Sequence, residues 1–286
     1  MKPEHTIDVA GVPVPLFLYG TAWKEDATRP LTEQAVNAGF RAIDTANQRR
    51  HYHEAGVGEA VRTLVEQGAV AREELFLQTK FTFLPGQDHR LPYDPEAPVR
   101  AQVFQSFESS QAHLGVDVID AYILHGPSRR YGLGPADWEA WQAMEALHDA
   151  GQVRLLGVSN VSRDQLEVLL ADARIPPVFV QNRCFARRGW DAAVRALCRD
   201  HDLRYQGFSL LTGNPEVLVD PALLEIASRY GRTPAQIVFR FALDVGMLPL
   251  TGTTKLAHMQ RDLEVLDFRL DEDDVTLIER LSTTRC

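Results

Sequence analysis

The chain has 286 residues, 45% of them hydrophobic, which is enough to bury a large core in a single domain spanning residues 1–286. The net charge of −9 and the pI of about 5.5 argue against a nucleic-acid-binding protein, which needs a basic face. The scattered Cys184, Cys198 and Cys286 predict neither a disulfide framework nor a CxxC metal site, and they favour a reducing compartment. Because no apolar run is long enough for a signal peptide or a membrane span, we expect a cytoplasmic protein that is not embedded in a membrane.

Eight short apolar segments recur along the chain and are typical of buried parallel strands, since each is brief and mostly bounded by polar residues or glycine. In chain order they are Leu16–Tyr19, Arg41–Asp44, Leu75–Thr79, Ala121–Leu124, Leu155–Val158, Val178–Gln181, Leu203–Gly207 and Met247–Leu250. Between them, apolar residues at helical spacing predict helices. These begin after Glu54, near Val103, after Pro135, at the Ser162–Gln165 capping box, at Thr233–Pro234 and near Asp271.

The alternation of strands and helices indicates a parallel α/β architecture. By itself it does not decide between a closed barrel and an open sheet. The first strand is not followed by a GxGxxG turn, which favours a closed (β/α)8 TIM barrel over an open dinucleotide-binding sheet. The proline-rich segment from Phe81 to Pro98 follows a strand directly, so we expect an irregular loop beside a pocket.

Polar side chains follow the predicted strands at the end where barrel enzymes carry their chemistry. Asp44, Lys80 and His125 each come at the end of a different strand. Taken alone, the aspartate is read as a turn or helix cap, the lysine as a solvated charge and the histidine as a structural residue. Their coincidence at strand ends predicts a site for proton chemistry.

Several segments resemble the aldo-keto reductases from about Tyr19 to the C-terminus. These are FRAIDTA (Phe40–Ala46), VGEAV (Val57–Val61), LQTK (Leu77–Lys80), LGVDVIDAYILHGP (Leu114–Pro127), GQVRLLGVSN (Gly151–Asn160) and VQN (Val180–Asn182). The resemblance implies a (β/α)8 barrel that begins with an N-terminal hairpin, which here is expected over Thr6–Val14 with its turn at Gly11. It also implies carbonyl reduction with a nicotinamide cofactor.

The family's catalytic group is an Asp, a Tyr, a Lys and a His, and Asp44, Lys80 and His125 match their motifs. The tyrosine usually comes five residues after the aspartate, where this chain has Arg49. Residues Asn47–His51 include an insertion of about two residues in this stretch. Tyr52, the only tyrosine between Asp44 and Lys80, is therefore predicted to be the catalytic acid. The alternative is that Tyr52 packs on a helix and the site lacks its phenol, with His51 as the next candidate.

The resemblance implies a role for each residue type. A phenol with a pKa of about 10 is a poor acid at neutral pH, and an adjacent ammonium group lowers its pKa. Lys80 is expected to do this for Tyr52, and Asp44 to hold Lys80 in place. His125 is expected to donate a hydrogen bond to the substrate carbonyl, while Tyr52 protonates the developing alkoxide.

Further positions match the family's cofactor site, to which Asp44 also belongs. Ser159, Asn160 and Gln181 match residues that hold the nicotinamide carboxamide, and Phe208 replaces a tyrosine that stacks on its ring. The resemblance also places Gly20 and Thr21 near the nicotinamide ribose, and Ser209 and Leu211 along the pyrophosphate.

The segment TGTTKLAHMQRDL is expected to face the adenosine 2′-phosphate. Gly252–Thr253 and His258 stand where NADPH-specific relatives have a Lys-Ser pair and an arginine. Lys255 and Arg261, on the first turns after Thr253–Thr254, remain candidate phosphate ligands, together with a helix N-terminus. The segment favours NADP(H) over NAD(H), and its predicted contacts are Gly252, Thr253, Thr254, Lys255, His258, Arg261 and Asp262.

Two other functions stay open at this point. A nicotinamide-binding regulatory protein with weak catalysis is compatible with the altered tyrosine spacing. A metal hydrolase is suggested by His51 and His53, because an HxH pair after a barrel strand can bind metal. This pair lies in an insertion and lacks an evident partner set, so no metal site is predicted. The expected partner is a small carbonyl substrate of unknown identity, and the expected state is a monomer.

Overall fold

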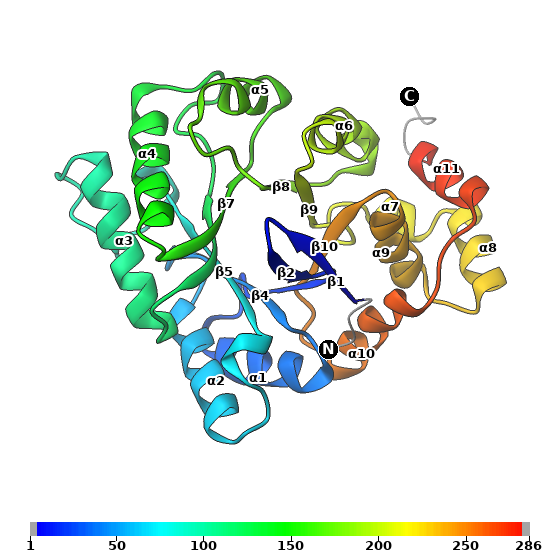
Figure 1. The fold of residues 1–286 in the computed structure, drawn as a ribbon. Coiled ribbons are helices and arrows are strands. Elements are labelled where there is room, and N and C mark those ends of the chain that lie inside the picture. Colours follow the sequence, from blue (N-terminus) through cyan, green and yellow to red (C-terminus); the bar gives the residue numbers. More distant parts are fainter. Residues whose placement is uncertain (1–4, 282–286) are drawn as a thin grey trace.

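Eight parallel strands pair edge to edge into a closed barrel in the computed structural model of the chain, which describes residues 5–281 (Figure 1). Around the ring the order is β10–β3–β4–β5–β6–β7–β8–β9. These strands are β3 (Leu18–Gly20), β4 (Ala42–Asp44), β5 (Phe76–Phe81), β6 (Ile119–Leu124), β7 (Val153–Ser159), β8 (Phe179–Arg183), β9 (Arg204–Phe208) and β10 (Met247–Thr251). The predicted barrel is confirmed, and each predicted strand is found with its ends shifted by at most two residues.

Helices surround the barrel and cover the outer faces of its strands (Figure 1). They are α1 (Thr28–Ala38), α2 (Glu54–Glu66), α3 (Val99–Leu114), α4 (Pro135–Asp149), α5 (Arg163–Asp172), α6 (Ala192–Asp200), α7 (Pro215–Leu218), α8 (Pro221–Tyr230), α9 (Pro234–Asp244), α10 (Leu256–Leu263) and α11 (Glu272–Arg280). Helices α1, α6, α7 and α8 were not predicted from the sequence. In α1 the cause is visible, because Thr28 and Thr32 occupy part of its buried face and break the apolar stripe.

An antiparallel hairpin of β1 (Thr6–Val9) and β2 (Val12–Pro15) lies across the barrel, as predicted (Figure 1). Its turn residues Ala10 and Gly11 both have positive φ, 49° and 80°, which is the geometry of a type I′ turn. Val9 and Val14 pack into the same apolar cluster as Leu18, at the start of β3. The hairpin therefore covers the end of the barrel where the strands begin.

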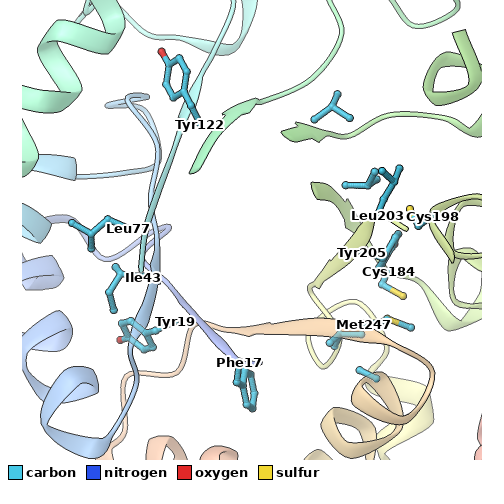
Figure 2. Close-up of a cluster of buried hydrophobic side chains, with 14 of the residues drawn as sticks. Phe17, Tyr19, Ile43, Leu77, Tyr122, Cys184, Cys198, Leu203, Tyr205 and Met247 are labelled. Atoms are coloured by element: carbon cyan, nitrogen blue, oxygen red, sulfur yellow. The ribbon is translucent and has the colours of Figure 1, made fainter. Parts of the chain in front are cut away.

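The strands divide the apolar residues into an outer and an inner core. Figure 2 shows side chains of the outer core, among them Ile43, Leu77 and Tyr205, on the side of the strands that faces the helices. The inner core contains Phe76 of β5, whereas the next residue, Leu77, belongs to the outer core. Because side chains alternate along a strand, Gln78 and Lys80 share the inward face of Phe76. The interior is thus apolar near the hairpin and polar toward the carboxyl ends of the strands.

Other sequence expectations have local outcomes. The segment from Phe81 to Pro98 beyond β5 is irregular as expected, apart from one short 3-10 turn at Leu84–Gly86. Cys184 and Cys198 are buried free thiols, and Cys286 lies outside the described residues. Over residues 5–281, no helix combines the length and the apolar character needed to cross a membrane.

Candidate active site

A cavity of about 640 Å³ opens at the carboxyl ends of the barrel strands. Most of the predicted site residues line it: Gly20, Asp44, Tyr52, His125, Ser159, Asn160, Gln181, Phe208, Ser209, Leu211, Gly252, Thr253, Thr254 and His258. The cavity lining does not include Thr21, Lys80, Lys255, Arg261 and Asp262. The strand ends that the sequence analysis singled out therefore do meet at one site.

Lys80 and Asp44 form an ion pair inside the barrel. The Lys80 ammonium is fully buried and donates to Asp44 Oδ1 at 2.6 Å and to the Thr45 carbonyl at 2.7 Å. Burial lowers the pKa of Lys80, and the negative charge of Asp44 opposes that shift. These two acceptors at the strand ends offset part of the cost of burying the ammonium.

Three glutamine amides complete this buried network. Asp44 Oδ1 also accepts from Gln78 Nε2 at 2.6 Å and from Gln181 Nε2 at 2.9 Å. Both amides in turn donate to Gln206 Oε1, at 2.8 and 2.9 Å. The sequence analysis missed Gln78 and Gln206. The sequence does contain a sign of them, because each is the one glutamine in a predicted buried strand, FLQTKF for Gln78 and RYQGF for Gln206.

Tyr52 lies beside both the lysine and the histidine. Lys80 Nζ is 5.3 Å from the centre of the Tyr52 ring, and the His125 ring centre is 6.0 Å from it. The inserted stretch is held in place by Gln48, whose carbonyl accepts the Tyr52 N–H and whose amide donates to the Gly86 carbonyl. Arg49, at the family's usual tyrosine position, instead pairs with Glu25 at 2.9 Å.

The electrostatics of the phenol differ from the sequence expectation. Burial raises the pKa of Tyr52 well above its usual range, and the charge of Asp44 raises it further. The expected lowering by Lys80 does not prevail, because the ammonium is bonded to Asp44 and faces the ring at a distance. Tyr52 therefore stays protonated at neutral pH, which is the state that a proton donor needs.

His125 is a neutral imidazole in this setting. Burial lowers its pKa to about 3, and the positive charge of Lys80 adds to the shift. Its Nδ1 lies 2.7 Å from the hydroxyl of Thr82, and its backbone carbonyl accepts from Asn160 Nδ2 at 2.7 Å. The ring is thus held from one side while it lines the cavity.

Next to these residues, side chains at the ends of β7, β8 and β9 line the cavity at the predicted nicotinamide position. Ser159 Oγ donates to the Gln181 carbonyl at 2.6 Å, which ties β7 to β8. Within the described residues, neither the side-chain oxygen of Asn160 nor that of Gln181 accepts a hydrogen bond. Phe208 offers a half-buried ring on the same wall. The wall thus presents two acceptors and an aromatic face.

The segment after β10 is arranged differently from the sequence expectation in two respects. Lys255 precedes α10 as its N-cap residue, whereas Arg261 lies in the last turn of that helix and not in the first turns. Asp262 is buried and accepts a hydrogen bond from Thr251 at 2.8 Å, and burial raises its pKa to about 7.

Thr21, which follows β3, also faces protein and not the cavity, since its hydroxyl donates to the Asp44 carbonyl at 3.0 Å.

Among the cavity residues that were not predicted from the sequence are two cations and a tryptophan. Lys24 is 7% exposed and donates to the Gly252 carbonyl at 2.7 Å, and burial lowers its pKa to about 8. Trp23 is largely exposed, and Arg183 stacks over the Phe208 ring at 5.5 Å. No local pattern distinguishes Lys24 from a solvated lysine, because the barrel must close before the loop after β3 meets the loop after β10.

The two histidines of the HxH pair have separate surroundings. The His51 ring packs against Trp23 with centres 4.0 Å apart, whereas His53 Nδ1 faces the Glu25 carbonyl at 3.3 Å. In the part of the chain that the structure describes, no group of three or more His, Cys, Asp or Glu side chains is placed to hold a metal ion.

Comparisons with known proteins agree with this geometry. Residues 19–283 match the Aldo/keto reductase family. The oxidoreductase YtbE of Bacillus subtilis is 30% identical over 95% of this chain and 90% of its own length. The 2,5-diketo-D-gluconic acid reductase B of a Corynebacterium species is 31% identical over 88% of this chain and 83% of its own length. An aldo/keto reductase structure from Brucella melitensis superposes with a TM-score of 0.80 at 26% identity, covering 96% of this chain and 98% of that one.

Proposed function

Since the chain belongs to the aldo/keto reductase family, we propose that it is an NADP(H)-dependent reductase of aldehydes or ketones in which Tyr52 is the proton donor. The observation that carries the proposal is that Tyr52 and His125 line the cavity side by side, with the buried Lys80 next to the Tyr52 ring. Lys80 and His125 flank the Tyr52 ring at 5.3 and 6.0 Å, and Asp44 holds Lys80 in place.

The residues at the ends of β7, β8 and β9 fit a nicotinamide. The free side-chain oxygens of Asn160 and Gln181 match the N–H donors of a carboxamide, and Phe208 can stack on a flat ring. The cavity then runs past Ser209 to Thr253 and His258, which gives room for the rest of a dinucleotide. When bound, the reduced nicotinamide supplies the hydride that reaches the carbonyl carbon.

The protein's own part is to bind the carbonyl oxygen and to deliver a proton to it. His125 is neutral, so it adds no charge and offers a hydrogen bond to the oxygen. The protonated Tyr52 phenol gives its proton to the oxygen as negative charge develops there. Lys80, next to the ring, stabilises the tyrosinate that remains, and Asp44 keeps that ammonium in position.

The preference for NADP(H) rests on cations near the far end of the cavity. Lys255 is at the N-cap position of α10, directly after Thr253 and Thr254, two residues of the cavity wall. A 2′-phosphate bound there would meet this side chain together with the backbone N–H groups that begin the helix. The diketogluconate reductase among the relatives supports carbonyl reduction, and a solved aldo-keto reductase with a similar fold (TM-score 0.82, 23% identity), which was crystallised with NADPH, is consistent with that cofactor.

The test is Tyr52→Phe, assayed by the loss of NADPH absorbance with a reactive aldehyde. We expect kcat to fall by roughly 10²–10⁴, as for loss of a general acid, while the Kd for NADPH stays within about twofold. Tyr131→Phe is the matched control, since that tyrosine is exposed and does not line the cavity. Full turnover by Tyr52→Phe would move the role of acid to His51. No aldehyde reduction by the unmodified protein, with NADPH still bound, would favour the regulatory function.

A further inference from the structure

Thr82 stands two residues after Lys80, where β5 has just ended, and it is 6% exposed. Its hydroxyl oxygen lies 2.7 Å from His125 Nδ1, on the far side of the imidazole from the nitrogen that remains for the cavity. Nothing in the sequence motifs pointed to this residue. Among the described residues, Thr82 is the hydrogen-bond partner of the His125 imidazole, at its Nδ1 nitrogen.

The loop after β5 fixes the direction of this hydroxyl. The Thr82 methyl packs where a side chain on Gly86 would be, since a Cβ there would lie 2.6 Å from Thr82 Cγ2. The Thr82 carbonyl accepts from the Tyr93 hydroxyl at 2.9 Å and from Gln87 Nε2 at 3.3 Å. With its methyl and its backbone held by the loop, Thr82 has its oxygen directed at the imidazole.

The number of donors and acceptors at this contact then favours one tautomer of His125. A hydroxyl has one proton, and within residues 5–281 the only hydrogen-bond partner of Thr82 Oγ1 is His125 Nδ1. If Nδ1 carried the imidazole proton, it would donate to Thr82 and leave the hydroxyl proton buried without an acceptor, which is costly. If Nδ1 is bare, it accepts the hydroxyl proton and every group is satisfied. The neutral imidazole then carries its proton on Nε2.

We propose that Thr82 is a positioning residue that holds His125 as the Nε2–H tautomer and directs that N–H at the substrate carbonyl oxygen. Without it, the imidazole is free to present an unprotonated nitrogen, which repels a carbonyl oxygen that is gaining negative charge. The irregular loop from residue 83 to residue 93 thereby contributes to catalysis through Thr82, although it does not touch the reacting atoms. This inference rests on the proposed function.

The tautomer can be measured without any turnover. Full-length protein labelled with ¹⁵N-histidine is examined by NMR at pH 7, and the His125 signals are identified by their loss in His125→Gln. Nε2 is recognised by its couplings to both ring C–H protons. We expect a protonated Nε2 and a bare Nδ1 in the unmodified protein. A protonated Nδ1 would overturn the proposal even if the enzyme reduces aldehydes normally.

Kinetics of two variants test the consequence. Thr82→Val keeps the shape and removes the hydroxyl, whereas Thr82→Ser keeps the hydroxyl and removes the methyl. We expect kcat to fall about ten- to a hundredfold in Thr82→Val with an unchanged Kd for NADPH, and to recover most of its value in Thr82→Ser. Thr32→Val is the matched control, because Thr32 is buried in α1 and its hydroxyl is unpaired.

Two results of the variants would contradict the proposal. Thr82→Val with the kcat of the unmodified enzyme would show that the hydroxyl does not matter. A loss in Thr82→Ser as large as in Thr82→Val would point to packing of the methyl instead. If Thr82→Val does not fold, the NMR result on the unmodified protein and the kcat of Thr82→Ser still decide the question. Failure of the proposed function itself would be recognised separately, as absence of reduction by the unmodified protein.

Discussion

At the scale of single residues, the site contains two lysines in opposite situations. Lys80 has a carboxylate partner, Asp44, at 2.6 Å and remains tied to it. Lys24 is also buried, yet among the residues described here no carboxylate pairs with it, and its bond is to the Gly252 carbonyl. A buried ammonium without an anion is unfavourable, which is why burial lowers the pKa of Lys24 to about 8. A cofactor phosphate in the cavity would supply the missing charge.

This leads to a prediction about the pH dependence of cofactor binding. Below about pH 8 Lys24 is charged and attracts the phosphates of NADPH, and above it the side chain becomes neutral. The Kd for NADPH should therefore rise as pH increases from 7 to 9.5, by up to about tenfold per pH unit above the pKa of free Lys24. Fluorescence titration with NADPH at each pH measures it. Lys24→Met should bind weakly and with a flat profile.

Lys255→Met is the matched control, because Lys255 is exposed. Its variant should keep the upward slope between pH 7 and pH 9.5, even if its affinity is lower throughout. A slope that persists unchanged in Lys24→Met would assign the titration to another group and remove Lys24 from the cofactor site.

At the scale of elements, β10 and α10 are joined by a buried carboxyl group. Asp262 in α10 accepts from Thr251 Oγ1 at 2.8 Å and has no cation beside it in the described part of the chain. Burial raises its pKa to about 7, although the hydrogen bond opposes the shift. The segment between the two elements, Gly252–Lys255, forms the predicted phosphate site, so this link holds the site in shape.

The sign of the effect on stability follows from the raised pKa. Unfolded Asp262 ionises near pH 4, whereas the folded carboxyl keeps its proton until about pH 7. The folded state thus binds more protons between these values, and stability from this group is lost as pH rises toward 7. Asp262→Asn removes the charge and keeps the shape. We expect it to raise Tm by several degrees at pH 8, by about a third as much at pH 5 and by about zero below pH 4, measured by calorimetry without cofactor.

Asp117→Asn is the control, because Asp117 lies on the exposed turn after α3, and it should leave Tm unchanged at each pH value. Asp220→Asn is unsuitable because Asp220 caps α8. A loss of stability in Asp262→Asn at pH 8 would show that the carboxylate form is accommodated in the folded protein. The raised pKa would then be wrong.

At the scale of the whole molecule, the sequence predicts the ring better than the site. Eight apolar runs identify the strands because parallel strands are buried on both faces, and Asp44, Lys80 and His125 could be found because they end such runs. Helix α1 was not predicted because threonines occupy part of its buried face and interrupt the apolar pattern. Lys24 and Gln206 could not be predicted because each contacts a residue that only closure of the barrel brings near. Thr82 contacts His125 because β5 pairs with β6, and no local pattern marks that contact. The prediction that Lys80 lowers the pKa of Tyr52 was wrong, because burial of the phenol raises that pKa and burial cannot be inferred from a motif.

Closure also links cofactor binding to the stability of the entire barrel. A ligand that binds only the folded protein stabilises it by about 2.7 kcal/mol at a concentration of 100 times its Kd, which raises Tm by roughly 4–5 °C for a domain of this size. The cavity wall draws on strands and loops from β3 to β10, so the bound dinucleotide would tie distant parts of the ring together. If the segment after β10 reads the 2′-phosphate, NADPH should raise Tm more than NADH at the same concentration.

Two cations are available to read that phosphate, and the structure ranks them. Lys255 is at the N-cap position of α10, next to Thr253 and Thr254 of the cavity wall, whereas Arg261 is six residues further along a helix that rises about 1.5 Å per residue. Lys255→Ala should therefore remove most of the difference in Tm between NADPH and NADH, and Arg261→Ala a smaller part. Arg199→Ala, an exposed change on α6, controls for loss of a positive charge and should leave the difference intact. Equal shifts of Tm with the two cofactors in the unmodified protein would show that this segment does not recognise the phosphate.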